Sequence, residues 1–488
     1  MTELSKLTMK QAREGLVKKK FTCVELTEAF IKKIEENRNL NAFITETPEL
    51  ALESAKISDE KFLGNDNRKL EGIPMVIKDL FCTKGIRTTA ASKILENYIP
   101  SYESTVTQKL SDAGYIMLGK TNLDEFAMGS TTTTSYFGPT VSPFKHKSDK
   151  RSLVPGGSSG GSATAVSANM CIAATGTDTG GSIRQPAAFT NLVGIKPTYG
   201  RASRFGIMAF ASSFDQAGIL AKNVTDTAIL TEVICGYDHK DSTSLKVQVP
   251  EFEKNLNSDI RGKKVGIIKE FEGIDKINPE ILKQYELAKK IIQERGAKLI
   301  EVSMPNLKYS PILYMVIAYG EAASNLSRYD GIKYGFRTKE KVDSLDDLYR
   351  KTRGEGFCRN VKKRVFVGWN MLSSENYEKY FLQAQKIRRM IFEDFQNAFK
   401  KVDVLFTPTS PNEPFAIELT KEEIDADITS NYLNDLFAIP VNIAGLPGIS
   451  VPMNLTSNNL PAGVQFIGNR LDEQSILNFG LAIEEEVK

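Results

Sequence analysis

Apolar residues recur every fourth position between residues 26 and 34, the spacing of one face of a helix. Two upstream pairs, Thr8 with Gln11 and Thr22 with Glu25, match the capping-box pattern that marks a helix start. The pattern predicts two N-terminal helices that pack an apolar stripe against the rest of the protein. No candidate chemistry falls in this segment.

Beyond it, short apolar runs alternate with helical patterns. A helix is expected after Asn278, a capping residue followed by Pro279, and it should end before Gly296. Another is expected over Asp472–Glu485, whereas the Pro- and Gly-rich stretch Ile439–Pro452 is typical of bends. This alternation favours an α/β fold, an α/β/α sandwich around a large mixed sheet. The runs expected to be strands are 75–78, 115–118, 171–174, 265–268, 299–302, 402–406 and 464–467.

The composition is that of a globular protein, with 41% apolar and 25% charged residues among 488. The 63 basic and 60 acidic residues leave a net charge of +3, which argues against a surface that itself grips nucleic acid. Five cysteines without a CxxC pair indicate reduced thiols and no zinc site. Neither a signal-like N-terminus nor a run of 18 apolar residues is present. We therefore expect a cytoplasmic location, no membrane contact and no metal.

Two glycine-serine loops, GGSSGGS and GTDTGGS, flank a segment of small residues. Glycine permits positive φ and close backbone approach, so such loops can point N–H groups at an anion. Neither loop has the lysine of a Walker loop, and the dinucleotide spacing GxGxxG is absent. A serine nucleophile and the oxyanion of acyl transfer remain as the interpretation. The loop serines are Ser158, Ser159, Ser162 and Ser182.

A serine nucleophile needs a base, and the chain has only two histidines. His146 and His239 lie in charged runs typical of exposed turns, so neither is expected to be catalytic. The substitute is Lys78, which ends an apolar run and whose pKa would fall if it were buried. The residues alone favour the alternative, in which the Lys78 amine reaches water. Lys120 and Asp124, beside another strand end, are expected to be members of structural ion pairs rather than to line a site.

The two loops, their spacing and the upstream lysine resemble the amidase signature family, whose members hydrolyse amides. The resemblance implies a triad in which Lys78 is the base, Ser158 relays the proton and Ser182 attacks the carbonyl. The two serines lie 24 positions apart (182 minus 158), which fits the family. The resemblance also implies a cis peptide between Gly157 and Ser158. The alternative for Ser182 is a helix cap without chemistry.

The same resemblance implies supporting roles around the nucleophile. Asp178 and Arg184 would hold the second loop and the lysine in place. The backbone N–H groups that would form the oxyanion hole belong to Thr179, Gly180, Gly181 and Ser182. The chain is expected to be one amidase domain, residues 1–488, with an N-terminal helical segment at 1–60 and the signature core at 72–216.

The stretch Tyr314–Gly335 resembles one branch of that family, the glutaminase subunits of tRNA-dependent amidotransferases. In that branch a Tyr, an Arg and an Asp bind glutamine, and the matching residues are Tyr314, Arg364 and Asp435. The chemistry fits, because glutamine has an α-carboxylate for an arginine and an α-ammonium for a carboxylate. The branch often has Tyr-Tyr where this chain has Tyr314-Met315. The alternative for Arg364 is a solvated place in a basic helix.

The resemblance implies a reaction and a set of partners. The chain would hydrolyse glutamine and pass ammonia to a partner subunit that converts Glu-tRNA(Gln), Asp-tRNA(Asn) or both to the amidated tRNA. It would join subunits B and C in a heterotrimer, need no cofactor itself, and contact tRNA mainly through the partner, where ATP and Mg²⁺ are used. Two alternatives stay open: a stand-alone amidase for another small amide, and a catalytically silent scaffold subunit.

Overall fold

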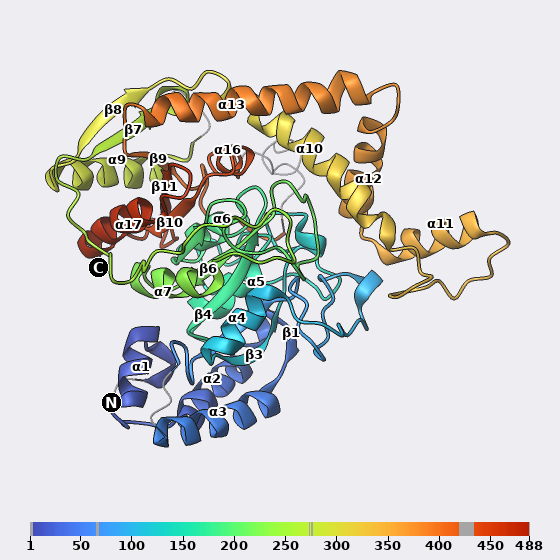
Figure 1. Ribbon diagram of the computed structural model, residues 1–488, viewed down its shortest axis with the longest axis horizontal. Helices are drawn as coiled ribbons and strands as arrows, with labels where there is room; N and C mark the ends of the chain where they lie inside the picture. Colours follow the sequence, from blue (N-terminus) through green and yellow to red (C-terminus); the bar gives the residue numbers. More distant parts are fainter. Residues whose placement is uncertain (1–2, 65–67, 273, 275–276, 419–433, 488) are drawn as a thin grey trace.

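The computed structural model describes residues 3–64, 68–272, 274, 277–418 and 434–487. At its centre lies one sheet of 11 strands in the order β1-β3-β2-β4-β6-β5-β10-β11-β9-β7-β8 (Figure 1). The strands are β1 (Phe43–Glu46), β2 (Pro74–Lys78), β3 (Ile116–Thr121), β4 (Ala173–Asp178), β5 (Val193–Lys196), β6 (Gln216–Ala221), β7 (Lys264–Ile268), β8 (Lys298–Val302), β9 (Val404–Pro408), β10 (Gly448–Pro452) and β11 (Gly463–Gly468).

The sheet is mixed, which confirms the expected fold class. Strand β2 runs parallel to β3 and β4, and β7 runs parallel to β8 and β9, whereas the other neighbours are antiparallel. The carboxyl ends of parallel strands meet at one edge of a sheet. Because Lys78 ends β2 and Asp178 ends β4, the lysine and the second glycine-serine loop are brought to the same edge.

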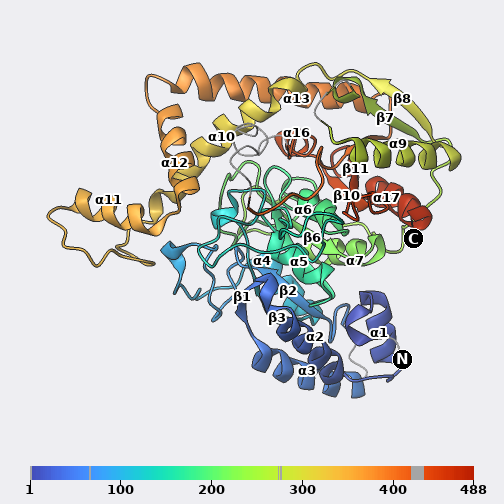
Figure 2. The ribbon, with the colours of Figure 1, turned by 180° about the vertical axis from the view of Figure 1, so that it is seen from behind.

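Helices cover both faces of this sheet (Figures 1 and 2). A Cβ at Gly448 of β10 would face Arg184 of α6. The next residue, Ile449, lies on the other face, where a Cβ at Gly480 of α17 would be 3.5 Å from Ile449 Cδ1. The α-helices are α1 (Met9–Val17), α2 (Cys23–Glu36), α3 (Pro48–Leu63), α4 (Thr105–Ala113), α5 (Gly160–Ser167), α6 (Arg184–Phe189), α7 (Val224–Ile234), α8 (Lys269–Glu272), α9 (Pro279–Glu294), α10 (Ser310–Asn325), α11 (Leu345–Gly356), α12 (Arg359–Met371), α13 (Gln383–Phe399), α16 (Ile439–Ile443) and α17 (Glu473–Val487). None of the helices in the described residues is both long and apolar enough to span a membrane.

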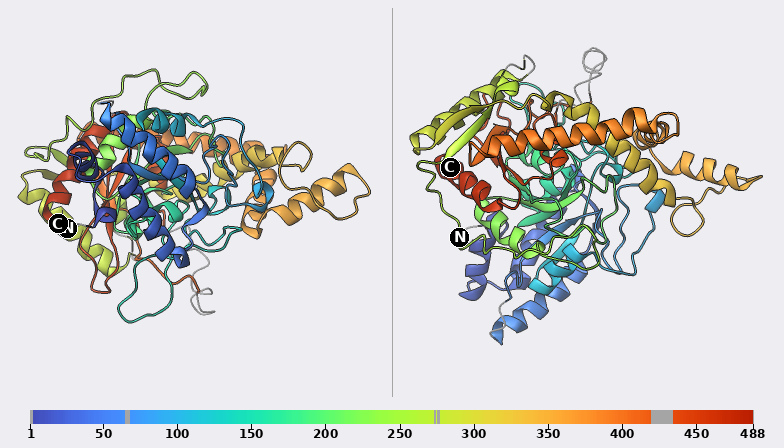
Figure 3. Two further views of the ribbon diagram at one scale, coloured as in Figure 1. Left: turned by 90° about the horizontal axis from the view of Figure 1, so that it is seen from below. Right: turned by 45° about the horizontal axis from the view of Figure 1, so that its top comes forward.

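Between β8 and β9 the chain leaves the sheet and forms an arm of helices α10 to α13, from which α11 extends outward (Figures 1 and 3). Helix α12 packs directly on α10 at Gly368. A Cβ at Gly368 would lie only 1.8 Å from the carbonyl oxygen of Tyr319. Glycine therefore sets the closeness of these two helices.

Several local predictions are confirmed. Thr8 and Thr22 form complete capping boxes at α1 and α2, and the apolar positions of residues 26–34 are buried. Asn278 caps α9 by accepting a hydrogen bond from Glu280 N–H, and that helix ends just before Gly296. All five cysteines are free thiols.

The prediction of bends over Ile439–Pro452 is wrong, because the stretch contains helix α16 and the central strand β10. Its prolines do not break these elements. Pro440 occupies the first turn of α16, where its missing N–H costs no hydrogen bond, and Pro452 is the last residue of β10. Strands β1, β5 and β6 were not expected either, because they are short or rich in Ala and Gly.

Candidate active site

Lys78 lies wholly inside the protein at the end of β2, so the interpretation that its amine reaches water is wrong. Its Nζ is 2.8 Å from Ser158 Oγ, 2.9 Å from Ser159 Oγ and 2.8 Å from Thr177 Oγ1. A protonated amine can donate to all three hydroxyls. A neutral amine has two N–H groups and a lone pair, so it can instead accept a proton from one of them.

Burial lowers the pKa of Lys78 to about 7, although the charges of Asp124, Asp178 and Asp215 act in the opposite direction. With such a pKa, a large fraction of the amine is neutral at physiological pH. A neutral amine within hydrogen-bond reach of a serine hydroxyl is the arrangement that a general base requires. Lys78 can therefore take a proton from Ser158.

The two glycine-serine loops are joined around this amine. The peptide between Gly157 and Ser158 is cis, as the family resemblance implies. Gly157 N–H donates to Gln185 Oε1 at 2.9 Å, and Ser159 N–H donates to Ser182 O at 3.2 Å. Ser158 is fully buried, whereas Ser182 keeps 8% of its surface exposed and lines a cavity. Of the two serines, only Ser182 is therefore open to a molecule in the cavity.

A buried ion pair holds the second loop. Asp178 accepts a hydrogen bond from Gly181 N–H at 2.8 Å and pairs with Arg184 Nη2 at 2.9 Å. Burial alone would raise the pKa of Asp178, but the Arg184 guanidinium holds that pKa well below its usual range. Arg184 also donates to Ala438 O at 3.1 Å, which ties the loop to the C-terminal part of the chain. The pair therefore fixes the turn that contains Ser182.

The expected oxyanion donors differ in their availability. Gly181 N–H is already engaged by Asp178, so it is the weakest of the four candidates. The N–H groups of Thr179, Gly180 and Ser182 make no hydrogen bond within the part of the chain that the structure describes. These three groups are the ones free to receive a developing oxyanion.

Tyr314 and Asp435 press against this loop from the cavity side. A Cβ at Gly180 would lie 2.8 Å from Tyr314 Cζ, and one at Gly181 would lie 2.7 Å from Asp435 Oδ1. Gly181 also has a φ of +137°, which side chains other than hydrogen rarely allow. Gly180 and Gly181 are thus required because Tyr314 and Asp435 leave no room for a side chain, and not only because the loop turns here.

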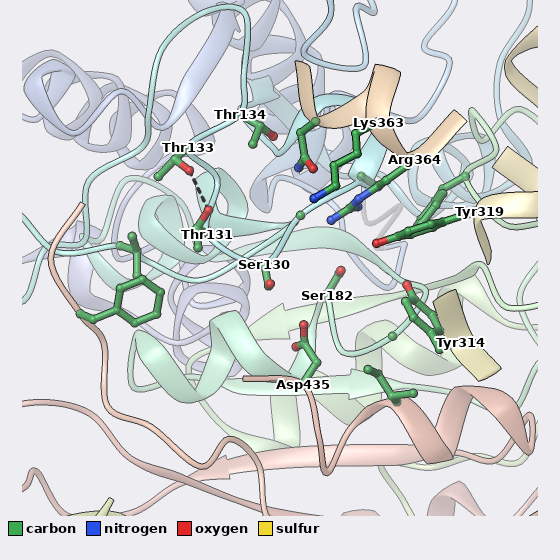
Figure 4. Close-up of a pocket in the computed structure, with 18 of the residues that line it drawn as sticks. Ser130, Thr131, Thr133, Thr134, Ser182, Tyr314, Tyr319, Lys363, Arg364 and Asp435 are labelled. Atoms are coloured by element: carbon green, nitrogen blue, oxygen red, sulfur yellow. Dashed lines mark hydrogen bonds between the residues drawn. The ribbon is translucent and has the colours of Figure 1, made fainter. Parts of the chain in front are cut away.

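A cavity of about 360 Å³ opens over Ser182. Figure 4 shows Ser182, Tyr314, Arg364 and Asp435 pointing into this space from different elements. The structure therefore brings together the expected nucleophile and the three residues matched to glutamine binding. His146 and His239 are not among the residues that line it.

Arg364 and Asp435 each present an atom without a protein partner. Arg364 lies with its guanidinium 5.4 Å from the centre of the Tyr319 ring, and its Nε is buried without a hydrogen bond in the described residues. Oδ1 of Asp435 is likewise buried without a hydrogen bond in the described residues. Burial raises the pKa of Asp435 to about 8, and the charges of Asp178 and Asp124 add to this effect. Arg364 is thus half-buried and lines the cavity, and it is not a fully solvated residue of the helix surface.

Sequence reasoning missed the hydroxyl-rich wall at residues 129–134. The Asp124 carboxylate holds this segment, accepting hydrogen bonds from the N–H groups of Thr131 at 3.2 Å and Thr132 at 2.8 Å. Asp124 therefore supports the cavity and forms no ion pair in the described residues, whereas Lys120 does pair, with Asp79 at 3.1 Å. The run of four threonines from residue 131 was the available signal.

Comparison with known proteins agrees with this geometry. The profile of the amidase family matches residues 25–477. The chain is 51% identical over all 488 of its residues to the A subunit of a glutamyl-tRNA(Gln) amidotransferase of Rickettsia bellii, covering 98% of that protein, and 50% identical to the corresponding subunit of Zymomonas mobilis over 99% of this chain and 98% of that one. The crystal structure of the A subunit of such an enzyme from Thermotoga maritima superposes with a TM-score of 0.78 at 38% identity, over 99% of this chain and 96% of that one. A peptide amidase from Stenotrophomonas maltophilia reaches 0.81 at 26% identity, over 99% and 97%.

Proposed function

Since this chain belongs to the amidase family, we propose that it is the glutaminase subunit of a tRNA-dependent amidotransferase. Its relatives at 50–51% identity are named as the A subunit of a glutamyl-tRNA(Gln) amidotransferase. It would hydrolyse the side-chain amide of glutamine and supply the ammonia to a partner subunit. That partner would convert Glu-tRNA(Gln), Asp-tRNA(Asn) or both to the amidated form.

One observation carries the choice of glutamine. Arg364 Nε and Asp435 Oδ1 are buried without a hydrogen-bond partner among the described residues, and both residues line the cavity of Ser182. Leaving such groups unpaired is costly, so a ligand that pairs both is favoured. The α-carboxylate of glutamine would pair with Arg364. Its α-ammonium would pair with Asp435, because a positive charge beside this carboxyl favours the ionised form and offsets the raised pKa of Asp435. The side chain of the amino acid would then extend toward Ser182.

The proposed reaction is nucleophilic catalysis through an acyl-enzyme. Neutral Lys78 takes a proton from Ser158, which takes one from Ser182 as the Ser182 oxygen attacks the amide carbonyl. The oxyanion is received by the N–H groups of Thr179, Gly180 and Ser182. The relay returns a proton to the leaving nitrogen, ammonia departs, and water releases glutamate from the ester.

The chain would act within a complex. Relatives named as the A component of an amidotransferase imply partner subunits, and we place this chain in a heterotrimer with subunits B and C in the cytoplasm. ATP and Mg²⁺ would be used at the partner, which would also make most of the contact with tRNA. The chain itself would need no cofactor, because Lys78 and two serines supply the acid–base and nucleophilic groups.

Two other functions are less well supported. A stand-alone amidase would have no use for the pair Arg364 and Asp435, and the peptide amidase is only 26% identical to this chain. A silent scaffold would have no use for a buried lysine in contact with a serine. Ammonia release from glutamine, measured with the chain alone and then with subunits B and C and charged tRNA, separates these functions. Release that rises with the partners supports the proposal, and hydrolysis of simple amides but not glutamine refutes it.

We expect Arg364→Ala to raise the KM for glutamine by about 30- to 100-fold while kcat changes far less, because a charge-assisted pair with the α-carboxylate is lost. Arg364→Lys should restore part of the affinity, since it keeps the positive charge but loses the planar guanidinium that can form two hydrogen bonds to one carboxylate. Arg389→Ala, which removes an exposed arginine from α13, is the control. An unchanged KM in Arg364→Ala would remove this residue from the glutamine site.

Gly368→Ala should also raise the KM for glutamine, although Gly368 does not line the catalytic cavity. Its new methyl group would meet the carbonyl of Tyr319 and push α12, with Arg364, away from α10. We expect a rise in KM of about tenfold or more in steady-state assays. Gly354→Ala is the matched control, because a Cβ there meets nothing within 4 Å. Equal kinetics of the two variants would show that the α10–α12 spacing does not set the site.

A further inference from the structure

One side of α12 is apolar and open to solvent. Phe366 and Trp369 are 72% and 69% exposed, and they lie three residues apart on the same helical face. Trp369 is the only tryptophan of the chain. Single exposed apolar residues are common, but two adjacent large aromatic side chains at this exposure are typical of an interaction surface.

These two aromatic side chains border a hollow of about 680 Å³ between α11, α12 and the end of α10. Phe357 and Val365 add apolar wall. Its basic residues are Arg350, Arg353 and Lys362, and the hollow also contains Asp330. An apolar, aromatic centre with arginine around it is the usual composition of a protein–protein interface core.

The charge of the arm favours an acidic partner. Residues 328–364 contain twelve Lys or Arg and six Asp or Glu, a net charge of +6 in a chain whose total is +3, and of these cations Lys363 and Arg364 line the catalytic cavity instead of this face. The cations beside the hollow are held by their own chain. Arg353 Nη1 donates to Leu326 O at 2.7 Å, Lys362 Nζ donates to Gly354 O at 2.8 Å, and Arg350 Nη2 pairs with Asp347 at 2.5 Å. The apolar, aromatic centre suits protein side chains, whereas a nucleic-acid backbone is bound mainly through cations, and the cations around this centre complement acidic side chains.

We propose that this face of α11 and α12 is where a partner subunit of the amidotransferase docks, with an apolar side chain in the hollow and acidic groups around it. This inference rests on the proposed function. Asn360, Lys363 and Arg364 of the same helix line the catalytic cavity. A partner seated on α12 would therefore act on the element that carries Arg364, which gives the complex a direct route to adjust glutamine binding.

The test replaces both aromatic residues, Phe366→Ala with Trp369→Ala. Both are exposed and outside the catalytic cavity, so the isolated variant should keep glutamine hydrolysis within about twofold of the wild type. Its affinity for the partner subunits should fall by about tenfold or more in a titration, since hot-spot aromatics carry much of the binding energy. Leu63→Ala, which truncates a side chain that is also 72% exposed, is the matched control and should bind normally.

A second readout uses the single tryptophan. With 5-fluorotryptophan incorporated, the full chain gives one ¹⁹F resonance for this face, which should shift when unlabelled partner subunits are added. A shift caused by tRNA alone, or normal assembly of the double variant, overturns the docking surface and leaves the glutaminase assignment intact. Failure of the wild-type chain to bind any partner overturns both. Absence of glutamine hydrolysis with normal, Trp369-dependent assembly overturns the proposed reaction alone.

Discussion

Ser182→Ala is expected to lower kcat for glutamine by about 10⁴-fold or more, the usual loss when a serine nucleophile is removed. The remaining groups, including the free N–H groups of the loop, cannot form the ester through which the reaction would pass. Ammonia and glutamate release at saturating glutamine measures the loss. Residual activity above about a tenth of the wild type would show that another group attacks the amide.

A loss of activity in Ser182→Ala can be assigned to chemistry, because the hydroxyl that it removes is not part of the hydrogen bonds that hold the loop. Ser182 Oγ makes no hydrogen bond within the described ranges, so the variant should fold with an unchanged melting temperature. Ser162→Ala is the matched substitution, because Ser162 is buried in the first turn of α5 and donates to Thr175 O at 2.9 Å without touching Lys78. We expect it to lose less than about tenfold in kcat.

Lys78→Met and Lys78→Arg should both lower kcat by about 10³-fold or more. The arginine variant is the informative one, because it keeps a cation but cannot lose its proton near neutral pH. In the wild type, only the neutral amine is a base, so kcat/KM should rise with pH through an ionisation near 7. Equal activity about 1.5 pH units below and above that ionisation would contradict the role of Lys78 as base.

The same lysine has a signature in stability. Its pKa is about 7 in the folded protein and about 10.5 when unfolded, so the unfolded chain binds more protons between these values. Its contribution to the free energy of unfolding therefore increases from pH 7 to about 10.5, and its burial is most costly below pH 7. Relative to the wild type, Lys78→Met should gain most stability at low pH. Chemical denaturation at about pH 6 and about pH 9 checks the sign.

The catalytic half of the site could be predicted from the sequence because its constraints are local. The second loop needs glycine at Gly180 and Gly181, where Tyr314 and Asp435 leave no room for a Cβ, and such positions leave a visible motif. Lys78 followed from the absence of a usable histidine. Its burial did not follow, because it depends on hydroxyl partners from two other segments.

The substrate side could not be predicted in this way. Arg364 and Asp435 lie on α12 and beside α16, and only family resemblance selected them, since a basic helix and an acidic turn are ordinary patterns. The role of the Asp124 carboxylate in holding the threonine segment could not be predicted either. Its hydrogen bonds from Thr131 and Thr132 N–H depend on the tertiary structure and leave no local pattern in the sequence. Helix α16 and strand β10 were not predicted because every proline was taken as a break, whereas a proline in the first turn of a helix or at the end of a strand is tolerated.

The order of the strands decides when this protein can become active during its synthesis. Strands β7 and β8 leave the ribosome before β9, β10 and β11, yet they join the sheet only through β9, which pairs with β11. Strand β11 in turn reaches the N-terminal half through β10 and β5. Residues 264–302 therefore cannot join the rest of the sheet until residue 468 has been synthesised, and until then apolar strand edges stay unpaired. A message truncated before β11 would yield no partial enzyme, only two halves of a sheet with nothing between them.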